Sequence, residues 1–202
     1  MGYYFDNKTN VESRKVVTKA EIANKYYTFM TDNNVFSKKG LDFGTRSLLE
    51  NIDIKNISGD VLDFGCGYGP IGIYIKSNTE AMVDMIDINE RALSLAKENA
   101  ILNKVDVNIF LSNIYSNVNK KYDYIVTNPP IRVGKKVLYE ILTGAKDYLK
   151  QNGHLIFVIN KDQGAKSTMK DMGKYYSVKL IAKNKGFYII DCELIDLLNK
   201  IM

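Results

Sequence analysis

From Asp60 onward, short runs of β-branched and apolar residues alternate with longer stretches in which apolar positions recur at helical spacing. This alternation is typical of βαβ units, in which helices connect parallel strands and cover both faces of the sheet. The predicted strands are Val61 to Phe64, Met82 to Asp87, Val107 to Leu111, Tyr122 to Thr127, His154 to Ile159, Val178 to Ala182 and Phe187 to Cys192. The pattern therefore predicts an α/β fold with a doubly wound, mostly parallel sheet of seven strands.

The clearest helix is predicted from Asn89 to Asn103. Asn89 is a residue type that caps helix N-termini, and Ala92, Leu95, Ala96 and the run Asn99 to Leu102 form a stripe at helical spacing. We interpret this stripe as core packing and nothing more.

The last two predicted strands are separated only by Lys183-Asn184-Lys185-Gly186, which is too short for a helical crossover. They are therefore expected to form an antiparallel hairpin at the sheet edge, a feature that most dinucleotide-binding dehydrogenase domains lack. Residues 1–59 are expected to form a short β-rich extension, with β-rich runs at Arg14 to Val17 and Tyr26 to Thr31 and a helix from Leu41 to Asn51. Because no linker or repeat divides the chain, residues 1–202 are predicted to form one domain, with its core at 60–202.

A glycine-rich turn follows the first strand of the predicted sheet. The segment Gly65-Cys66-Gly67-Tyr68-Gly69-Pro70-Ile71-Gly72 follows Phe64, and Pro70 is placed to open a helix. Glycines suit this position because the backbone turns tightly and approaches a ligand without a Cβ in between. Gly67, Gly69 and Gly72 also spell G-x-G-x-x-G, which taken alone is equally compatible with NAD.

Two carboxylates accompany the glycine turn. Asp87, followed by Ile88, ends the second strand twenty residues after Gly67, where it can accept both hydroxyls of a ribose; the alternative is a helix cap before Asn89. Asp63 lies two residues before the first glycine, where it could hold, directly or through water, the ammonium group of a ligand with a methionine moiety. A nicotinamide cofactor carries no such cation, so Asp63 favours a different nucleoside ligand.

The most specific motif, Asn128-Pro129-Pro130-Ile131, follows the fourth strand. The two prolines fix φ and remove two N–H donors, which leaves the Asn128 side-chain oxygen and the Pro129 carbonyl as a rigid row of acceptors. Such a row can hold both hydrogens of a planar amino group. A simple turn is the alternative, but it does not explain why the motif falls at the carboxyl end of a strand beside the ligand crevice of an open α/β sheet.

This acceptor row suits a reaction in which an amino nitrogen is the nucleophile. The lone pair of an amino group conjugated to a base is delocalised, and accepting both N–H bonds localises it and aims it at the electrophile. Positioning of this kind contributes roughly 7–11 kcal/mol. We expect an in-line displacement without a covalent intermediate, a metal or a strong general base. The single histidine, His154, and the absence of metal-ligand spacing at Cys66 and Cys192 agree with this expectation.

Composition adds three expectations. The start of the chain shows no targeting segment and no run of residues resembles a membrane span, so the protein is expected in the cytoplasm. The net charge of +5 is compatible with a polyanionic partner, although many small proteins without one carry a similar charge. Lysines crowd the C-terminal part, where a solvated helix face is the alternative explanation: Lys135, Lys136, Lys146, Lys150, Lys161, Lys166, Lys170, Lys174, Lys179, Lys183 and Lys185.

Several of these segments resemble known methyltransferases. Asp63-Phe64-Gly65-Cys66-Gly67-Tyr68-Gly69 resembles the first motif of the Rossmann-like class I enzymes that use S-adenosylmethionine (SAM), whose seventh strand is also inserted antiparallel. Asn128-Pro129-Pro130 resembles the N-P-P-[aromatic] motif of enzymes acting on amino nitrogens of bases or of glutamine. Further matching segments are Thr31 to Lys38, Leu41 to Leu49, Asn128 to Lys135, Asn160 to Ala165 and Lys185 to Phe187. Over nearly its whole length the chain is similar to small-domain methyltransferases related to the bacterial 16S ribosomal RNA guanine-N2 methyltransferase C.

The resemblance implies SAM as cofactor, guanine N2 as acceptor, and ribosomal RNA or the small ribosomal subunit as substrate. It also implies that Phe36 borders the active site and that Ser112 and Asn113 read the adenine of SAM. The candidate cofactor-binding residues are Phe36, Asp63, Gly65, Cys66, Gly67, Gly69, Asp87, Ile88, Ser112, Asn113 and Asn128, and the candidate catalytic residues are Asn128, Pro129, Pro130 and Ile131. Because Ile131 replaces the aromatic residue of the motif, either Ile131 or Arg132 is expected to cover the target base.

Three alternatives stay open from the sequence. A protein glutamine N5-methyltransferase would use the same Asn-Pro-Pro row, although such enzymes usually carry an aromatic residue at the position of Ile131 and an added recognition domain. A SAM-binding module without catalysis is the second alternative, and NAD-linked oxidoreduction is the third. Long members of the resembled family carry an additional N-terminal domain, and this chain is expected to comprise the catalytic unit alone. Oligomeric state is open.

Overall fold

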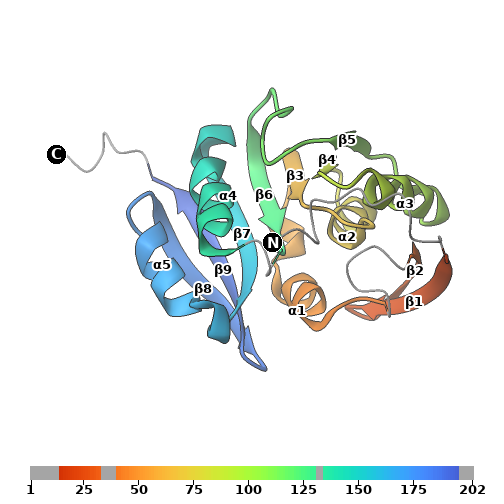
Figure 1. Cartoon of the computed structure of the whole chain (residues 1–202), viewed down its shortest axis with the longest axis horizontal. Helices are drawn as coiled ribbons and strands as arrows, with labels where there is room; N and C mark the ends of the chain where they lie inside the picture. The colour runs from red at the N-terminus through yellow and green to blue at the C-terminus, as the bar shows by residue number, and fades with distance from the viewer. Residues whose placement is uncertain (1–13, 33–39, 131–133, 196–202) are drawn as a thin grey trace.

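The computed structural model describes residues 14–32, 40–130 and 134–195, and a seven-stranded sheet forms its centre (Figure 1). Its order is β5-β4-β3-β6-β7-β9-β8. The strands are β3 (Asp60–Phe64), β4 (Met82–Asp87), β5 (Asn108–Leu111), β6 (Tyr122–Thr127), β7 (Leu149–Asn160), β8 (Tyr176–Asn184) and β9 (Phe187–Leu194). The first five are parallel, and β9 is inserted antiparallel between β7 and β8. The predicted sheet and its C-terminal hairpin are confirmed.

The strand order reverses between β3 and β6. From β3 the chain moves outward to β4 and β5, and it then returns to β6 on the other side of β3. Val61 of β3 pairs with Tyr124 of β6, and Asp63 pairs with Val126. In open α/β sheets, a crevice forms outside the carboxyl ends of the two strands at such a switch point.

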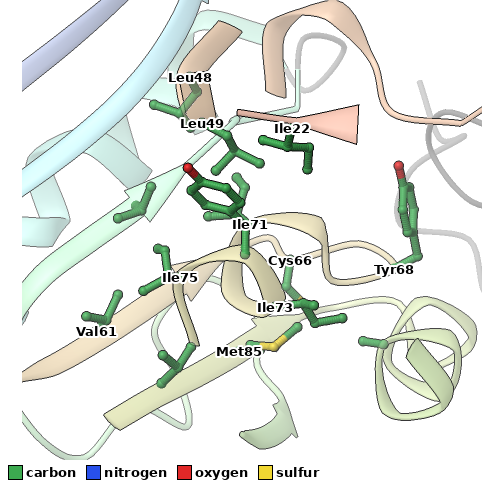
Figure 2. Packing of buried hydrophobic residues seen from close by; sticks show 14 of the residues in the cluster. Ile22, Leu48, Leu49, Val61, Cys66, Tyr68, Ile71, Ile73, Ile75 and Met85 are labelled. Atoms are coloured by element: carbon green, nitrogen blue, oxygen red, sulfur yellow. The ribbon is translucent and has the colours of Figure 1, made fainter. Parts of the chain in front are cut away.

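Helices cover both faces of the sheet. They are α1 (Phe43–Asn51), α2 (Pro70–Asn78), α3 (Glu90–Leu102), α4 (Gly134–Tyr148) and α5 (Ala165–Met172), with short 3-10 turns η1 (Ile54–Asn56) and η3 (Lys161–Gln163). Because successive strand residues face opposite sides, Val61 packs with α1, α2 and α3, whereas its neighbour Leu62 packs with α4 and α5. Figure 2 shows part of the first cluster, with Leu48 of α1 and Ile75 of α2 among its members.

An N-terminal hairpin packs against the first cluster. Its strands are β1 (Val16–Ile22) and β2 (Lys25–Thr31), joined at Ala23 and Asn24, both of which have positive φ. The strand expected at Arg14 to Val17 is therefore misplaced, because the β-branched run marks only its beginning. Beyond it, buried Ala20 and Ile22 alternate with exposed charged residues, a pattern typical of a half-buried strand.

The predicted cap of α3 is confirmed, and part of its predicted stripe is wrong. The Asn89 side chain accepts hydrogen bonds from the N–H groups of Arg91 and Ala92, at 3.0 and 3.3 Å. Ile101 and Leu102, however, are 77% and 46% exposed. Ile101 lies on the exposed face of the helix, one turn after exposed Lys97, and Leu102 is the last residue of the helix.

Asn99 is buried on the same helix, but its role is polar. Its side-chain oxygen accepts the Met30 N–H at 2.6 Å, and its amide nitrogen donates to the carbonyls of Met30 and Tyr68 at 2.9 and 2.8 Å. Asn99 thus joins β2 to the glycine turn, and the interpretation of this position as apolar packing is wrong. Buried backbone groups need such partners.

The extension and the sheet share one hydrophobic cluster. Ile22 and Phe29 of the hairpin belong to the same cluster as Leu49 of α1 and Val61 of β3. Figure 2 shows Ile22, Leu49 and Val61 in this cluster. Within the described residues, the core therefore continues across the boundary that the sequence placed at residue 60. The single domain over residues 1–202 stays a prediction.

Candidate active site at the carboxyl edge of the sheet

Four predicted segments meet at one edge of the sheet. The glycine turn follows β3, Asp87 ends β4, Ser112 follows β5 and Asn128 follows β6. Because these strands are parallel, their carboxyl ends lie at the same edge, next to the switch point between β3 and β6 (Figure 1). A hydrogen bond of 2.8 Å from the Thr127 hydroxyl to the Phe64 carbonyl joins the ends of β6 and β3.

Gly65 and Gly67 face open space. Their φ angles are +68° and +57°, and a Cβ built on either would meet no other group within 4 Å. Gly69 differs, because at φ +99° its Cβ would lie 2.8 Å from the Met85 Cε. The first two glycines thus leave room for a ligand beside the backbone, whereas Gly69 permits the entry into α2 and its close packing on β4.

Asp63 is fully buried beneath the glycine turn. One carboxylate oxygen accepts the Gly72 N–H at 2.8 Å, and the other has no hydrogen-bond partner. Burial raises the pKa of Asp63 to about 7; the Gly72 bond opposes this rise, and the neighbouring Asp87 charge adds to it. A buried carboxylate with an open acceptor is costly unless a cation approaches it, so Asp63 suits the ammonium group of a methionine moiety.

Asp87 holds two backbone groups at the end of β4. Its oxygens accept the N–H of Gly67 and the N–H of Asn89, each at 2.9 Å, and burial raises its pKa. The capping alternative is therefore partly right, since Asp87 organises the turn that leads into α3. Each carboxylate oxygen can accept a further bond, so the side chain also has capacity for the hydroxyls of a ribose.

The side chain of Cys66 lies in the core. Cys66 is 4% exposed and belongs to the cluster in Figure 2, and its N–H donates to the Ile86 carbonyl at 2.8 Å. Burial raises the pKa of the Cys66 thiol well above its ordinary value. If Cys66 contacts a ligand, it can do so only through its backbone. Ile88, another candidate residue, is half-buried and follows Asp87 at the end of β4.

In the loop after β5, the Ser112 side chain is buried and the Asn113 side chain is exposed. The Ser112 hydroxyl is buried, donates to the Ile114 carbonyl at 2.9 Å and accepts the Asn117 N–H at 3.2 Å. The Ser112 N–H bonds the Asp87 carbonyl at 3.0 Å, which ties this loop to β4. Asn113 is exposed at the same edge, so its side chain is the accessible one of the pair.

The Asn128 side chain is held by α1. Its amide nitrogen donates to the Thr45 hydroxyl oxygen at 2.9 Å and to the two Asp42 carboxylate oxygens at 3.3 and 3.5 Å. This arrangement leaves the amide oxygen as the acceptor. Pro129 is buried and Pro130 is half-buried beside it. Sequence reasoning assigned no role to Asp42 or Thr45, although both lie in the segment Leu41 to Leu49 that matched the resembled family. The helix predicted from Leu41 begins at Phe43, which makes Asp42 its N-cap.

A cavity of about 200 Å³ opens next to the two prolines. It is smaller than pockets that enclose a whole ligand, which are roughly 300–1,000 Å³, and its size suits one part of a larger molecule. The residues that line it are Pro129, Pro130, Gly134, Lys135, Leu138, Ile159 and Gln163. Gln163 belongs to one of the segments that matched the resembled family, and the structure places that segment beside the Asn128 loop.

Three predicted residues, Phe36, Ile131 and Arg132, lie outside the described residues. The predictions that Phe36 borders the site and that Ile131 or Arg132 covers the base therefore stay predictions. Within the described ranges, no cluster of three or more His, Cys, Asp or Glu side chains is arranged to hold a metal ion. In the same ranges, no helix is long and apolar enough to cross a membrane.

Comparison with protein families decides the class. The model of one family, described as methyltransferase small domain, matches residues 26–191. The chain belongs to the methyltransferase small domain family. The match spans the hairpin strand β2, the glycine turn, the Asn128 loop and most of β9. The predicted methyltransferase class is confirmed, and with it the prediction that the enzyme depends on SAM. The NAD alternative is wrong.

Relatives of this chain match it over different lengths. Uncharacterized protein YbxB of Bacillus subtilis (strain 168) is 41% identical over 95% of this chain and 98% of that protein. Ribosomal RNA small subunit methyltransferase C of Psychromonas ingrahamii is 34% identical over 78% of this chain and 46% of that protein. The chain thus spans nearly all of the first relative but less than half of the second.

A solved structure shows the same fold. The Thermus thermophilus 16S rRNA N2 G1207 methyltransferase, in complex with AdoMet and guanosine, superimposes with a TM-score of 0.80 at 22% identity. The match covers 90% of this chain and 51% of that protein. This likeness confirms the class I methyltransferase fold.

Proposed function

We propose that this protein transfers the methyl group of SAM to the exocyclic N2 amino group of a guanine in 16S ribosomal RNA. The observation that carries the proposal is the Asn128 loop. This loop lies at the carboxyl end of β6, and Pro129 and Pro130 border a cavity. The side-chain amide nitrogen of Asn128 donates to Thr45 and Asp42. The amide oxygen is therefore left to accept an N–H bond from an acceptor molecule.

The residues at the carboxyl edge fit SAM. Asp63 offers an unpartnered buried oxygen to the ammonium group, Gly65 and Gly67 leave space for the methionine moiety, and Asp87 offers acceptors to the ribose. We assign contact with the adenine to exposed Asn113, with Ser112 shaping its loop. When bound, SAM supplies an electrophilic methyl group on a sulfonium ion.

The Asn128 loop orients the acceptor. The Asn128 oxygen and the Pro129 carbonyl accept the two hydrogens of the amino group, which directs its lone pair toward the methyl donor. The proton leaves during or after transfer, so a strong general base is not required. His154, the single histidine of the chain, bonds Asp191 at 2.9 Å and stacks on Tyr124, and it takes no part in this scheme.

An RNA acceptor is supported by two further observations. Several relatives bear the name ribosomal RNA small subunit methyltransferase C, and the solved relative acts by its name on guanine N2 of 16S rRNA. Lysines also surround the site. Lys135 lines the cavity. Lys183 and Lys185 lie at the end of β8 and in the turn that follows it. Lys161 lies beside this turn, because its backbone N–H donates to the Gly186 carbonyl and its side chain lies next to Gly186. Phosphates are the ligands that such lysines favour.

These lysines keep their charges available within the described part of the chain. The ammonium groups of Lys135, Lys183 and Lys185 lie over the rings of Tyr139, Tyr188 and Phe43, at 4.9–5.1 Å from the ring centroids. None of the three forms an ion pair with a carboxylate of the described residues. A cytoplasmic location is part of the proposal, because a ribosomal substrate is found there.

The experiment that tests the proposal compares acceptors. Labelled methyl transfer from SAM is measured with unmodified small-subunit RNA, assembled small subunits, large-subunit RNA and a glutamine-containing peptide. We expect label in small-subunit RNA or small subunits only, and loss of that label with Asn128→Ala. Label in the peptide would favour a protein glutamine N5-methyltransferase, and binding of SAM without transfer to any acceptor would favour the binding-only alternative.

A further inference from the structure

The N-terminus of α1 lies against the Asn128 loop. Asp42 is the N-cap of this helix, and its carboxylate accepts the N–H groups of Gly44 and Thr45 at 2.9 and 3.2 Å. Thr45 is 3% exposed. The same carboxylate and the Thr45 hydroxyl also accept from the Asn128 amide nitrogen. One helix end thus holds a side chain that lies 86 positions away in the chain.

These contacts determine which way the Asn128 amide points. With its nitrogen bound by the Thr45 hydroxyl and the Asp42 carboxylate, the amide oxygen is directed away from α1. The flipped orientation would place that oxygen against a carboxylate, and the amide nitrogen would lose all three acceptors. An amide has similar shape in both orientations, so hydrogen bonds of this kind decide between them.

The negative charge of Asp42 acts through the amide. A hydrogen bond from an amide N–H to a carboxylate is charge-assisted, and it polarises the amide so that its oxygen becomes a stronger acceptor. The nitrogen of an acceptor amino group becomes positive as it gains a methyl group. A fixed negative charge one amide away stabilises that state more than the ground state, which is the condition for accelerating the reaction.

Phe187, the first residue of β9, packs against the first turn of α1. A Cβ on Gly44 would lie 3.0 Å from the Phe187 ring and 3.1 Å from the Asp42 carboxylate, so the helix end fits closely between them. The ring centroids of Phe43 and Phe187 are 5.6 Å apart. Segments around Gly44, Asn128 and Phe187, which are distant in the sequence, therefore meet at one place.

We propose that Asp42 and Thr45 are positioning residues that direct the Asn128 amide oxygen toward the acceptor amino group, and that Asp42 also supplies the negative charge that stabilises methyl transfer. This inference rests on the proposed function. It assigns roles in the site to two residues at the N-terminus of α1 that were not among the candidate site residues.

Two substitutions test it without removing the helix cap. Asp42→Asn keeps a capping oxygen, because Asn caps helices as well as Asp does, but it loses the charge and places an N–H donor beside Asn128. Thr45→Val keeps the shape and loses the acceptor. We expect each to lower kcat about ten- to a hundredfold, with the SAM dissociation constant and the acceptor KM changed less than about threefold. Thr45→Ser should restore activity, and the matched control Asp147→Asn, at an exposed carboxylate, should leave it unchanged.

A double-mutant cycle asks whether Asp42 acts through Asn128. In an Asn128→Ala background, Asp42→Asn should cause no further loss of kcat. An additive loss would overturn the inference, because it would show that Asp42 acts independently of the amide. Equal kcat for Asp42→Asn and the wild type would overturn it as well.

A measurement without substrate separates this inference from the proposed function. In the NMR spectrum, the side-chain amide protons of Asn128 should shift and exchange with solvent at least tenfold faster in Asp42→Asn and in Thr45→Val than in the wild type. Unchanged signals would overturn the positioning role, even if the wild type methylates RNA. Changed signals in a protein that transfers no methyl to RNA would contradict the proposed function and leave the positioning contact established.

Discussion

Asp63 is a carboxylate held under the glycine turn with one oxygen unpartnered. Burial raises its pKa to about 7, so in the folded protein without ligand the carboxyl is mostly protonated below that pH and mostly ionised above it. The contribution of Asp63 to stability is therefore present below about pH 4, and it is lost as the pH rises toward 7. Asp63→Asn should make the ligand-free protein more stable than the wild type at pH 8, by on the order of 2 kcal/mol.

Urea unfolding of both ligand-free proteins at pH 4 and pH 8 checks this prediction. The advantage of Asp63→Asn should appear at pH 8 and disappear at pH 4. The variant should also lose most of the stabilisation that SAM gives to the wild type, because its amide cannot neutralise an ammonium group. An equal stability difference at the two pH values would show that ionisation of Asp63 is not the cause.

Asp87 and Asn128 are expected to serve different ligands. Asp87→Ala should weaken SAM binding at least about tenfold, since it removes the acceptors for the ribose and frees the Gly67 N–H. Asn128→Ala should keep SAM affinity within about threefold and lower methyl transfer about a hundredfold or more. Calorimetry with SAM and single-turnover transfer measure the two quantities. If Asn128→Ala cannot bind SAM, this division of roles is wrong.

At the scale of elements, the lysines that we assign to RNA lie at the end of β8 (Lys183), in the turn that follows it (Lys185) and in η3 beside that turn (Lys161). Replacing Lys161, Lys183 and Lys185 together by Gln should lower RNA affinity, and it should reduce the slope of log K against log salt concentration by about 2 if each lysine meets one phosphate. The SAM dissociation constant should not change.

A matched control for these lysines is available on other elements. Lys19, Lys55 and Lys104 are exposed and lie outside the candidate site, so changing all three to Gln removes the same charge. If this control changes the salt dependence of RNA binding as much as the triple substitution of Lys161, Lys183 and Lys185 does, RNA binding depends on net charge alone and the assigned surface is wrong.

The elements were predictable where their signal is local. Strands β3 to β9 follow from apolar runs, and the antiparallel hairpin follows from the short gap between the last two predicted strands, which is only two residues long between β8 and β9 in the structure. The hairpin strand β1 was missed in part, because the prediction followed the β-branched run at its start and not the alternation of buried Ala20 and Ile22 with exposed Lys19 and Glu21. The polar role of Asn99 was also missed, because its partners Met30 and Tyr68 are distant in the sequence.

The site was predictable to the same extent. The sequence indicated Asp63, Gly67 and Asp87 because each lies at or just after the end of a predicted strand. In the structure, Gly67 donates its N–H to Asp87, and Asp63 lies beneath the same turn. The contact between Asp42 and Asn128 could not be read from the sequence, because it spans 86 positions and depends on how α1 packs on the sheet. Residue type alone also could not separate Gly65 and Gly67, which face open space, from Gly69, which packs against Met85.

On the scale of the whole sheet, a network of ion pairs and the candidate site lie at opposite edges. At the amino edge, Lys150 bonds the Asp60 and Asp123 carboxylates at 2.8 and 2.7 Å, and Lys120 bonds Asp60 and Asp84, each at 3.1 Å. These charges have partners and are engaged in holding strands together. At the carboxyl edge, the unpartnered oxygen of Asp63 and the open space at the glycines are left for ligands.

The identity of the methylated atom tests the account most directly. Unmodified small-subunit RNA is incubated with the protein and SAM, digested to nucleosides and analysed by mass spectrometry against standards for each methylated base. The account predicts N2-methylguanosine at a defined position, and its absence from the product of Asn128→Ala. Methylation at a ring nitrogen, a carbon or a ribose oxygen would contradict it, because none of these acceptors presents the two amino hydrogens that the Asn128 oxygen and the Pro129 carbonyl are placed to accept.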